Sequence, residues 1–255
     1  MSWKVVQAAV IGTSHAGIGE VCQDNCAVAT FLAPCGEECL LALVSDGAGS
    51  AIRGRMGARV ACEAGVRVIE EWVIEAQSLS DLSSDVVASW VDTIHYQLWL
   101  ASRVEGHTPR DFACTLLGAV IGEKNAAFFQ VGDGAIVIGD GNGFRPVFWP
   151  DSGEYANMTY FVTDEDMLSH LHSEISLAAP LEVAVFSDGL QRLALAYESR
   201  TAHNPFFEPM FARLRQSSND ECDVLSEQLA RFLGSARVNE RTDDDKTLVL
   251  ATRRL

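Results

Sequence analysis

Short apolar runs, each bounded by glycine and polar residues, recur along the chain and predict buried β-strands. Most of these runs follow one another through short turns, which favours antiparallel pairing because a tight turn reverses the direction of the chain. Residues 114–148 in particular predict one continuous antiparallel meander. We expect strands at residues 5–11, 26–32, 40–44, 114–121, 126–131, 135–139, 144–148, 181–186 and 247–251.

Between these runs the apolar residues change to a helical spacing. From Met56 to Trp72 they recur every four positions, which predicts one apolar stripe on a helix over residues 55–76. Two long helices directly after a strand hairpin favour a helical layer on a sheet, so we expect one α+β sandwich domain over residues 1–255. Further helices are expected at residues 85–104, 190–197, 205–216 and 222–233.

Aspartates stand at the ends of several predicted strands. Asp46 and Asp188 each follow an apolar run within a Ser-Asp-Gly sequence, Asp133 follows another run, and Asp244 precedes the last one. If these strand ends converge, they form an oxygen-rich cluster suited to Mg²⁺ or Mn²⁺. Any single Asp-Gly pair is more often a turn, as we expect for residues 140–143, so the metal hypothesis rests on the repetition.

The composition limits the classes of partner. Of the 255 residues, 48% are hydrophobic, and 35 acidic against 19 basic residues give a net charge of −16. This charge argues against binding to nucleic acid or to an anionic membrane surface, because both need a basic face. A phosphorylated substrate stays compatible, because bound cations reverse the sign of the charge locally. The acidic surface favours a protein target of basic or modest local charge.

The cysteine content bears on the compartment. Seven cysteines, without a cleavable signal pattern or a long apolar run, predict a cytoplasmic protein with reduced thiols. Cys22 and Cys26 are separated by three residues, as are Cys35 and Cys39. A structural zinc site is therefore an alternative, but this gap is wider than the usual two residues, so small buried thiols are favoured.

Five short motifs, in order and spread over nearly the whole chain, resemble the metal-dependent protein serine/threonine phosphatases of type 2C, in their bacterial form. Each motif alone is weak, but their order, with strands and helices correctly placed between them, makes the resemblance specific. The motifs are Gln23-Asp24-Asn25, Ser45-Asp46-Gly47, Ala113-Cys114-Thr115 with Gly132-Asp133-Gly134, Ser187-Asp188-Gly189-Leu190, and Asp244-Asp245-Lys246-Thr247.

The resemblance implies an α-β-β-α sandwich, in which two mainly antiparallel sheets pack face to face between helical layers. It also implies two Mn²⁺ or Mg²⁺ ions per chain in the cleft between the sheets, and a third, weaker site. By position, Asp46 would bridge both ions, and the carbonyl of Gly47 would bind one of them. Asp188 and Asp244 would complete the shell of the other ion, and Asp133 would join Asp188 at the third site. Asp46, Asp188 and Asp244 are thus the implied catalytic residues.

The chain departs from the family pattern in its first acidic motif. The glutamate that usually precedes the aspartate is replaced by Gln23, and a neutral amide binds Mg²⁺ more weakly. Asp24 is then expected to take over part of this task as a metal ligand. Gln23 and Asp245 are expected to lie just behind the ligands.

A second departure concerns the substrate phosphate. The family usually has an arginine five residues before this aspartate, and here that position is Gly19. His15 in the same loop, and Arg53 or Arg55 after the glycine-rich turn, are the candidates to bind phosphate instead. An ordinary exposed loop histidine is an equally good interpretation of His15.

The predicted function is hydrolysis of phosphoserine and phosphothreonine in proteins by a water activated between two cations. The expected partner is a phosphoprotein, with a protein kinase as one candidate. Gln23 and Gly19 favour an alternative, a pseudo-phosphatase that binds a phosphoprotein without cleaving it. A phosphoesterase for small esters has neither a histidine-rich cluster nor a Gly-x₄-Gly-Lys loop in its favour. Residues 149–180, the least regular stretch, predict either a substrate-facing flap or a long surface loop.

Overall fold

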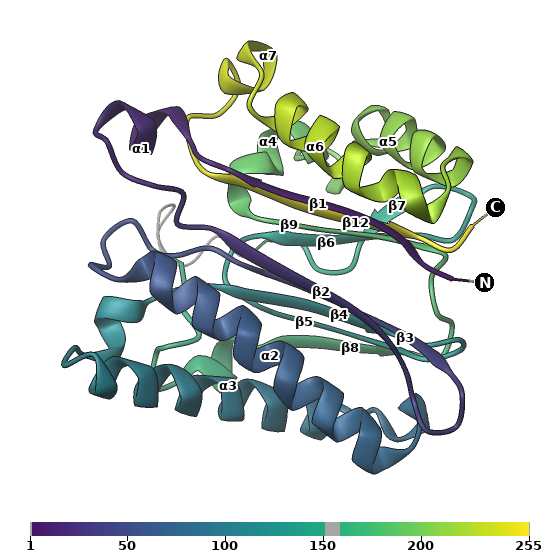
Figure 1. Cartoon of the computed structure of the whole chain (residues 1–255), viewed down its shortest axis with the longest axis horizontal. Helices are drawn as coiled ribbons and strands as arrows, with labels where there is room; N and C mark the ends of the chain where they lie inside the picture. The colour runs from purple at the N-terminus through teal and green to yellow at the C-terminus, as the bar shows by residue number, and fades with distance from the viewer. Residues whose placement is uncertain (1, 151–158, 255) are drawn as a thin grey trace.

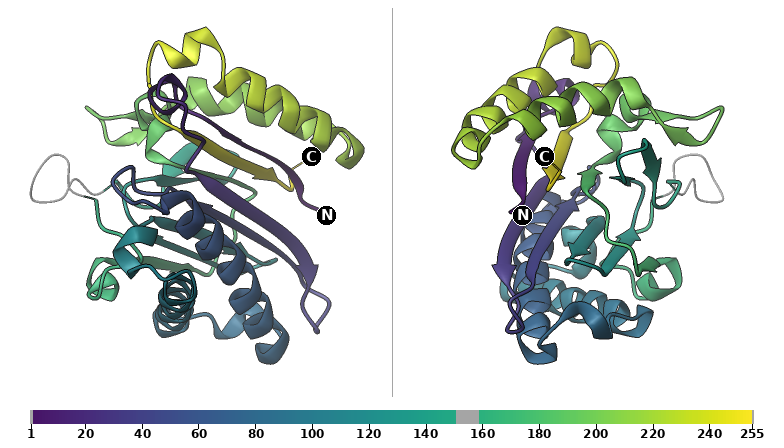
Figure 2. Two further views of the ribbon diagram at one scale, coloured as in Figure 1. Left: turned by 60° about the vertical axis from the view of Figure 1, so that its left-hand side comes forward. Right: turned by 90° about the vertical axis from the view of Figure 1, so that its right-hand side faces the viewer.

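The computed structural model describes residues 2–150 and 159–254, which form two β-sheets packed face to face between helices (Figure 1). Figure 2 shows the same layers from two further directions, with helices on the outer face of each sheet. All strand pairs between these residues are antiparallel. The expected α-β-β-α sandwich is therefore confirmed.

The first sheet, the lower one in Figure 1, has the strand order β2-β3-β4-β5-β8. Helices α2 (Gly54–Ala76) and α3 (Ser84–Val104) cover its outer face. Its strands are β2 (Asn25–Leu32), β3 (Glu38–Ser45), β4 (Leu116–Ile121), β5 (Ala126–Val131) and β8 (His172–Ser176).

The second sheet has the order β1-β12-β9-β6-β7 and is covered by α5 (Asn204–Gln216) and α6 (Cys222–Leu233). Its strands are β1 (Lys4–Val10), β12 (Lys246–Thr252), β9 (Glu182–Phe186), β6 (Ala135–Gly139) and β7 (Phe144–Pro146). The shorter elements are α1 (Thr13–Gly17), α4 (Gln191–Ala194), α7 (Ala236–Asn239), β10 (Leu195–Ala196) and β11 (Thr201–Ala202). None of the helices in the described part of the chain has the length and apolar character needed to cross a membrane.

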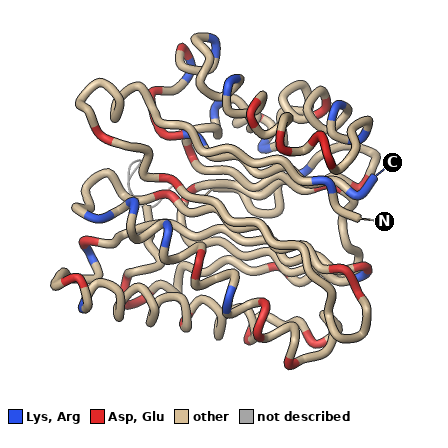
Figure 3. The backbone as a smooth tube through the Cα atoms, in the orientation of Figure 1, with Lys and Arg blue, Asp and Glu red and all other residues tan. Residues whose placement is uncertain are grey.

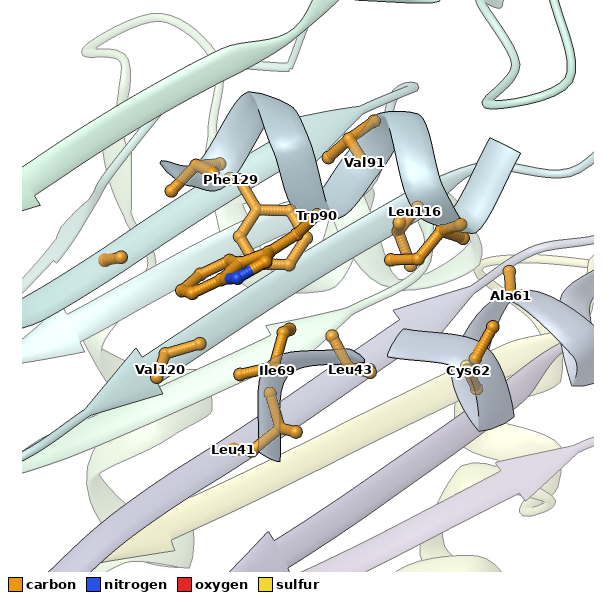
Figure 4. Close-up of a cluster of buried hydrophobic side chains, with 14 of the residues drawn as sticks. Leu41, Leu43, Ala61, Cys62, Ile69, Trp90, Val91, Leu116, Val120 and Phe129 are labelled. Atoms are coloured by element: carbon orange, nitrogen blue, oxygen red, sulfur yellow. The ribbon is translucent and has the colours of Figure 1, made fainter. Parts of the chain in front are cut away.

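The buried residues form three hydrophobic layers because successive strand residues point to opposite faces of a sheet. On β3, Leu41 and Leu43 pack against the helices, whereas Leu40 and Val44 pack against the other sheet. Figure 4 shows the layer beneath α2 and α3, where Trp90 lies over the first sheet with its ring centroid 6.3 Å from that of Phe129. With both faces packed, the strand ends are held rigidly enough to position polar groups.

The expected meander over residues 114–148 is wrong. Strands β4 and β5 belong to the first sheet, whereas β6 and β7 belong to the second. The chain crosses between the sheets at residues 132–134, where Gly132 has a φ of +116° and a Cβ would lie 2.5 Å from Cγ2 of Thr115. The length of a turn and the alternation of side chains do not distinguish a hairpin from such a crossing.

Two further segments differ from the expectation. Residues 190–197 do not form one helix, because a 3-10 turn (Asp188–Leu190) leads into α4, and Leu195 then pairs with Ala202 in a small hairpin. Within 149–180, residues 151–158 lie outside the described part. The remainder contains strand β8, which the sequence did not predict because its residues are only half-buried and mostly polar. The expected turn at residues 140–143 is confirmed, since the amide of Asn142 donates to Oδ1 of Asp140 over 2.8 Å.

Candidate active site

The turn after β3 holds Asp46 at the edge of the first sheet. The amide of Asp46 donates to Oγ1 of Thr115 over 2.9 Å, and the amide of Thr115 donates back to the carbonyl of Asp46 over 2.8 Å. A Cβ on Gly47 would lie 2.3 Å from the carbonyl carbon of Gly54, at the start of α2. The backbone approach is possible only for glycine, and it fixes the turn against the helix.

Asp24, just before β2, connects the two sheets. It is only 6% exposed, and its Oδ2 accepts a hydrogen bond of 2.7 Å from Oγ of Ser187, which follows β9. Oγ of Ser187 in turn accepts from the amide of Thr247 over 3.0 Å. One hydroxyl thus links the strand ends of both sheets beneath the cluster of aspartates.

The remaining aspartates come from the second sheet and from the crossing between the sheets. Asp188 follows β9, and Asp133 lies at the crossing, where its Oδ2 accepts from Oγ1 of Thr159 over 2.6 Å. Asp244 lies two residues before Lys246, where β12 begins. Gly189 packs so closely there that a Cβ would lie 2.0 Å from the carbonyl oxygen of Asp245.

These aspartates affect one another electrostatically. Burial, followed by the charges of Asp24 and Asp188, raises the pKa of Asp46 well above its ordinary value. Burial, followed by the charges of Asp133 and Asp244, raises the pKa of Asp188 to about 7. Burial also raises the pKa of Asp24 to about 6, and burial raises the pKa of Asp133 above its ordinary value. All five predicted carboxylates therefore lie in one interacting cluster (the aspartate cluster), near the ends of both sheets where Figure 3 shows acidic residues.

The aspartate cluster suits a hard divalent cation. Oδ1 of Asp24 and Oδ1 of Asp188 are buried and have no hydrogen-bond partner, so each offers a free ligand oxygen. Repulsion among the carboxylates is relieved either by protons or by cations, and an all-oxygen ligand set favours Mg²⁺ or Mn²⁺ over softer metals. In the described part of the chain, no group of three or more histidine, cysteine or acidic side chains is arranged so that it could hold a metal ion as it stands. The oxygen ligands and the negative charge of these residues thus fit Mg²⁺ or Mn²⁺, and the oxygens are held at separate strand ends.

Asp245 organises the loop before β2. Its Oδ1 accepts from the amide of Gly12 and its Oδ2 from the amide of Gln23, each over 2.6 Å. Nδ1 of His15 lies 3.0 Å from the same Oδ2. Burial opposes the charged imidazole, but the contact and charge of Asp245 outweigh it and raise the pKa of His15. His15 is therefore held by Asp245 rather than free in the loop, and its Nε2 faces Gly49.

Gln23 lies where the backbone of Gly54 approaches the Asp46 turn. Its Oε1 is buried without a partner, and its Nε2 donates to Glu20 over 3.2 Å. A cavity of about 800 Å³ opens beside it and is lined by Gln23, Gly49, Arg53 and Arg55, among others. The structure thus places both arginine candidates for phosphate binding in this cavity.

The cysteines are not members of the aspartate cluster, although Sγ of Cys22 lies 4.0 Å from the carbonyl oxygen of Asp24. All seven are free thiols, and the cysteines of the two Cys-x₃-Cys spacings make separate contacts, such as Sγ of Cys26 with Oε1 of Gln7 at 3.6 Å. Burial raises the pKa of Cys22 and of Cys114 to about 12, so both thiols stay neutral.

Sequence reasoning gave no role to two hydroxyl residues that hold the site. Ser187 supports Asp24 and Thr115 supports the backbone of Asp46. Both lie inside motifs that the sequence analysis singled out, next to the residues expected to bind metal. Their roles depend on contacts between distant segments, which the motifs alone do not reveal.

Comparison with known proteins shows the family to which the chain is similar. A family model described as Protein phosphatase 2C matches residues 11–234. The chain is 39% identical over 252 residues to Serine/threonine-protein phosphatase 3 of Escherichia coli (strain K12), with 98% of each chain covered.

Solved structures share the fold at low sequence identity. The serine/threonine phosphatase PstP/Ppp of Mycobacterium tuberculosis superposes with a TM-score of 0.66 at 12% identity, with 100% of each chain covered. The PstP catalytic domain in complex with two manganese ions gives 0.61 at 13% identity, covering 98% of this chain and 97% of that one. The expected resemblance is confirmed by the family match and the 39% identical relative: the chain belongs to the protein phosphatase 2C family.

Proposed function

We propose that this protein phosphatase hydrolyses phosphoserine and phosphothreonine in proteins with two divalent cations, Mn²⁺ or Mg²⁺, which when bound supply an activated water and neutralise phosphoryl charge. The observation that carries the proposal is the convergence of Asp24, Asp46 and Asp188 from both sheets, with free buried oxygens on Asp24 and Asp188.

The place of each aspartate in the family motifs indicates which cation it would hold. Asp46 would hold both cations and the Gly47 carbonyl one of them, while Asp188 and Asp244 would complete the other shell. Asp133, with Asp188, would hold a third, weaker ion. Asp24 would contribute its Oδ1 to this set of ligands, because only its Oδ2 is occupied by the hydrogen bond from Ser187.

Gln23 and Asp245 act behind these ligands. The carboxylate of Asp245 joins Gly12, Gln23 and His15, so it fixes the loop that faces the Asp46 turn. The buried Oε1 of Gln23 is left as a neutral acceptor without a partner beside Gly54.

The substrate phosphoryl group would be held by cationic side chains around the cluster. His15 carries more positive charge near neutral pH because Asp245 raises its pKa, and Arg53 lines the adjoining cavity. These two residues take the place of the arginine that the family usually has at the position of Gly19. The partner is then a phosphoprotein, with a protein kinase as one candidate, and a cytoplasmic role in signalling is compatible with the free thiols.

The test is hydrolysis of p-nitrophenyl phosphate and of a phosphothreonine peptide, measured with Mn²⁺, with Mg²⁺ and with chelator. We expect metal-dependent turnover that is lost in Asp46→Ala. The matched control is Asp92→Ala, because Asp92 is an exposed aspartate on α3 away from the cluster. A folded wild-type protein that turns over neither substrate with any metal would contradict the proposal and favour the pseudo-phosphatase, and Gln23→Glu and Gly19→Arg would then be the changes to test.

A further inference from the structure

The cavity beside the aspartate cluster is basic although the whole chain carries a net charge of −16. Three arginines line it: Arg53, Arg55 and Arg59. Glu20 is the one acidic residue among the lining residues of the described chain. In Figure 3, which has the orientation of Figure 1, basic positions lie along the tube at the start of α2, with acidic positions nearby.

These three arginines (the arginine row) begin next to the proposed site of hydrolysis. A Cβ on Gly54 would lie 2.9 Å from Oε1 of Gln23 and 3.1 Å from the carbonyl carbon of Gly47, so the start of α2 contacts the Asp46 turn directly. Arg55 follows Gly54, and Arg59 comes one helical turn later. A substrate whose phosphoryl group reaches Asp46 therefore has this cavity within reach of its neighbouring residues.

The charges of the arginine row are only partly neutralised. Arg55 has no hydrogen bond or ion pair among the described residues, whereas Arg59 pairs with Glu63 in an exposed contact of 2.9 Å. Within the described part of the chain, the side chain of Arg53 makes one hydrogen bond, from Nε to Nε2 of His107 over 3.3 Å. Glu20 already accepts a hydrogen bond from the side-chain Nε2 of Gln23. The first turn of α2 has no acidic residue and no side-chain cap, so the positive end of a 23-residue helix adds to the same field.

We propose that the cavity binds acidic side chains next to the phosphorylated residue, so that the enzyme selects phosphosites flanked by aspartate or glutamate. This inference rests on the proposed function, because it assigns the substrate of the same site. Arg55 and Arg59 lie on one face of α2, about 6 Å apart along its axis. An extended peptide covers that length in about two residues, so acidic residues within a few positions of the phosphosite can reach both.

The positive charge of the cavity points to an acidic target segment, whereas the composition of the whole chain led us to expect a basic or weakly charged one. The acidic surface as a whole favours a target with basic or modest charge, but a bound peptide contacts the cleft and not the average surface. Close contacts at the arginine row act over a few ångströms, whereas distant surface charges are screened over about 8 Å at physiological salt.

The test uses phosphothreonine peptides of equal length that differ only in three flanking residues on each side, which are all glutamate, all alanine or all lysine. We expect kcat/KM with Mn²⁺ to be at least about tenfold higher for the glutamate peptide than for the lysine peptide, from two contacts each giving about threefold to fivefold. In the double variant Arg55→Glu with Arg59→Glu, this ratio should fall below one. The control is Arg67→Glu, an exposed arginine further along α2 that does not line the cavity and should leave the ratio unchanged.

Two results would overturn the inference. One is turnover of all three wild-type peptides at similar rates or with a preference for lysine. The other is a ratio in the double variant equal to that of the wild type. Because the readout is a ratio within one protein, a general loss of activity in the variant does not imitate the expected change.

A second readout separates this inference from the proposed function. If no peptide is hydrolysed, the proposed function fails, and the fluorescence anisotropy of labelled peptides in chelator still measures binding. Tighter binding of the glutamate peptide, weakened by the double variant and by added salt, would support the acidic-substrate cavity on its own. Equal dissociation constants for the three peptides would overturn it.

Discussion

Oγ of Ser187, at the end of β9 in the second sheet, donates a hydrogen bond of 2.7 Å to Oδ2 of Asp24, at the start of β2 in the first. The same oxygen accepts from the amide of Thr247. Ser187 thus ties the ends of the two sheets together at the point where the aspartate cluster forms.

Removal of this hydroxyl should affect both stability and metal binding. In Ser187→Ala, a buried carboxylate oxygen and a buried amide lose their partner, which should lower the free energy of unfolding by about 1–3 kcal/mol. Urea denaturation with chelator measures this loss, and Mn²⁺ titration should show weaker binding. Ser89→Ala, at an exposed helical position, is the control and should change stability by less than about 0.5 kcal/mol. Equal stability of Ser187→Ala and wild type would show that the link between the sheets is not needed.

The contact between the Asp46 turn and α2 should not tolerate a side chain. In Gly47→Ala, the new Cβ would lie 2.3 Å from the carbonyl carbon of Gly54, so the turn or the helix must move. We expect a loss of about 1–3 kcal/mol or more in stability and a large loss of turnover. Gly17→Ala is the matched control, since a Cβ there meets nothing within 4 Å. Wild-type turnover in Gly47→Ala would contradict the described turn.

The stability of the metal-free protein should depend on pH. Because the pKa of Asp188 is raised to about 7 and that of Asp24 to about 6 in the folded state, the folded protein holds more protons than the unfolded chain between the ordinary value of 3.8 and about 7. Its stability should therefore fall as the pH rises through this window, by about 1.4 kcal/mol per pH unit for each such proton.

Thermal denaturation in chelator at pH 5.5 and pH 8 measures this dependence. The Tm should be lower at pH 8, and Mn²⁺ should restore it because the cations replace the protons between the carboxylates. Asp188→Asn should flatten the dependence in chelator, since the amide carries no charge. A metal-free protein more stable at pH 8 than at pH 5.5 would contradict the described electrostatics.

Lys246 should be needed to hold the segment that carries Asp244. It is fully buried, and its Nζ donates to Oδ1 of Asn239 over 3.0 Å and to the carbonyl of Asp244 over 3.2 Å. Lys246→Met keeps the aliphatic part but leaves these acceptors unpaired, so we expect a loss of about 1–3 kcal/mol in stability. Urea denaturation checks this, with Lys124→Met in the β4–β5 turn as the control. A stability equal to that of the wild type would show that this buried amine is not structural.

The sequence predicted those parts of the site that local pattern determines. Asp46 and Asp188 follow apolar runs directly, so their places at strand ends could be inferred from neighbouring residues. The supports of these residues could not, because Ser187 meets Asp24 across 163 positions and Thr115 meets Asp46 across 69. Such pairs depend on how the two sheets pack, which periodicity does not encode.

In the fold, too, the elements set by local pattern were predicted and those set by long-range packing were missed. Helices α2, α3, α5 and α6 were predicted to within a residue at each end because their apolar stripes are strong. The crossing at residues 132–134 was missed because a short glycine turn fits a hairpin equally well, and β8 because its side chains are half-buried and polar. His15 could be interpreted only from the structure, where Asp245 lies 230 positions further along the chain.

The central claim is that carboxylates from both sheets hold two cations through Asp46, and calorimetric titration with Mn²⁺ tests it most directly. We predict two ions per wild-type chain, and a loss of both or a single weak one in Asp46→Ala, with Asp92→Ala unchanged. A wild-type protein that binds no Mn²⁺, or an Asp46→Ala variant that binds the ions as the wild type does, would contradict the account.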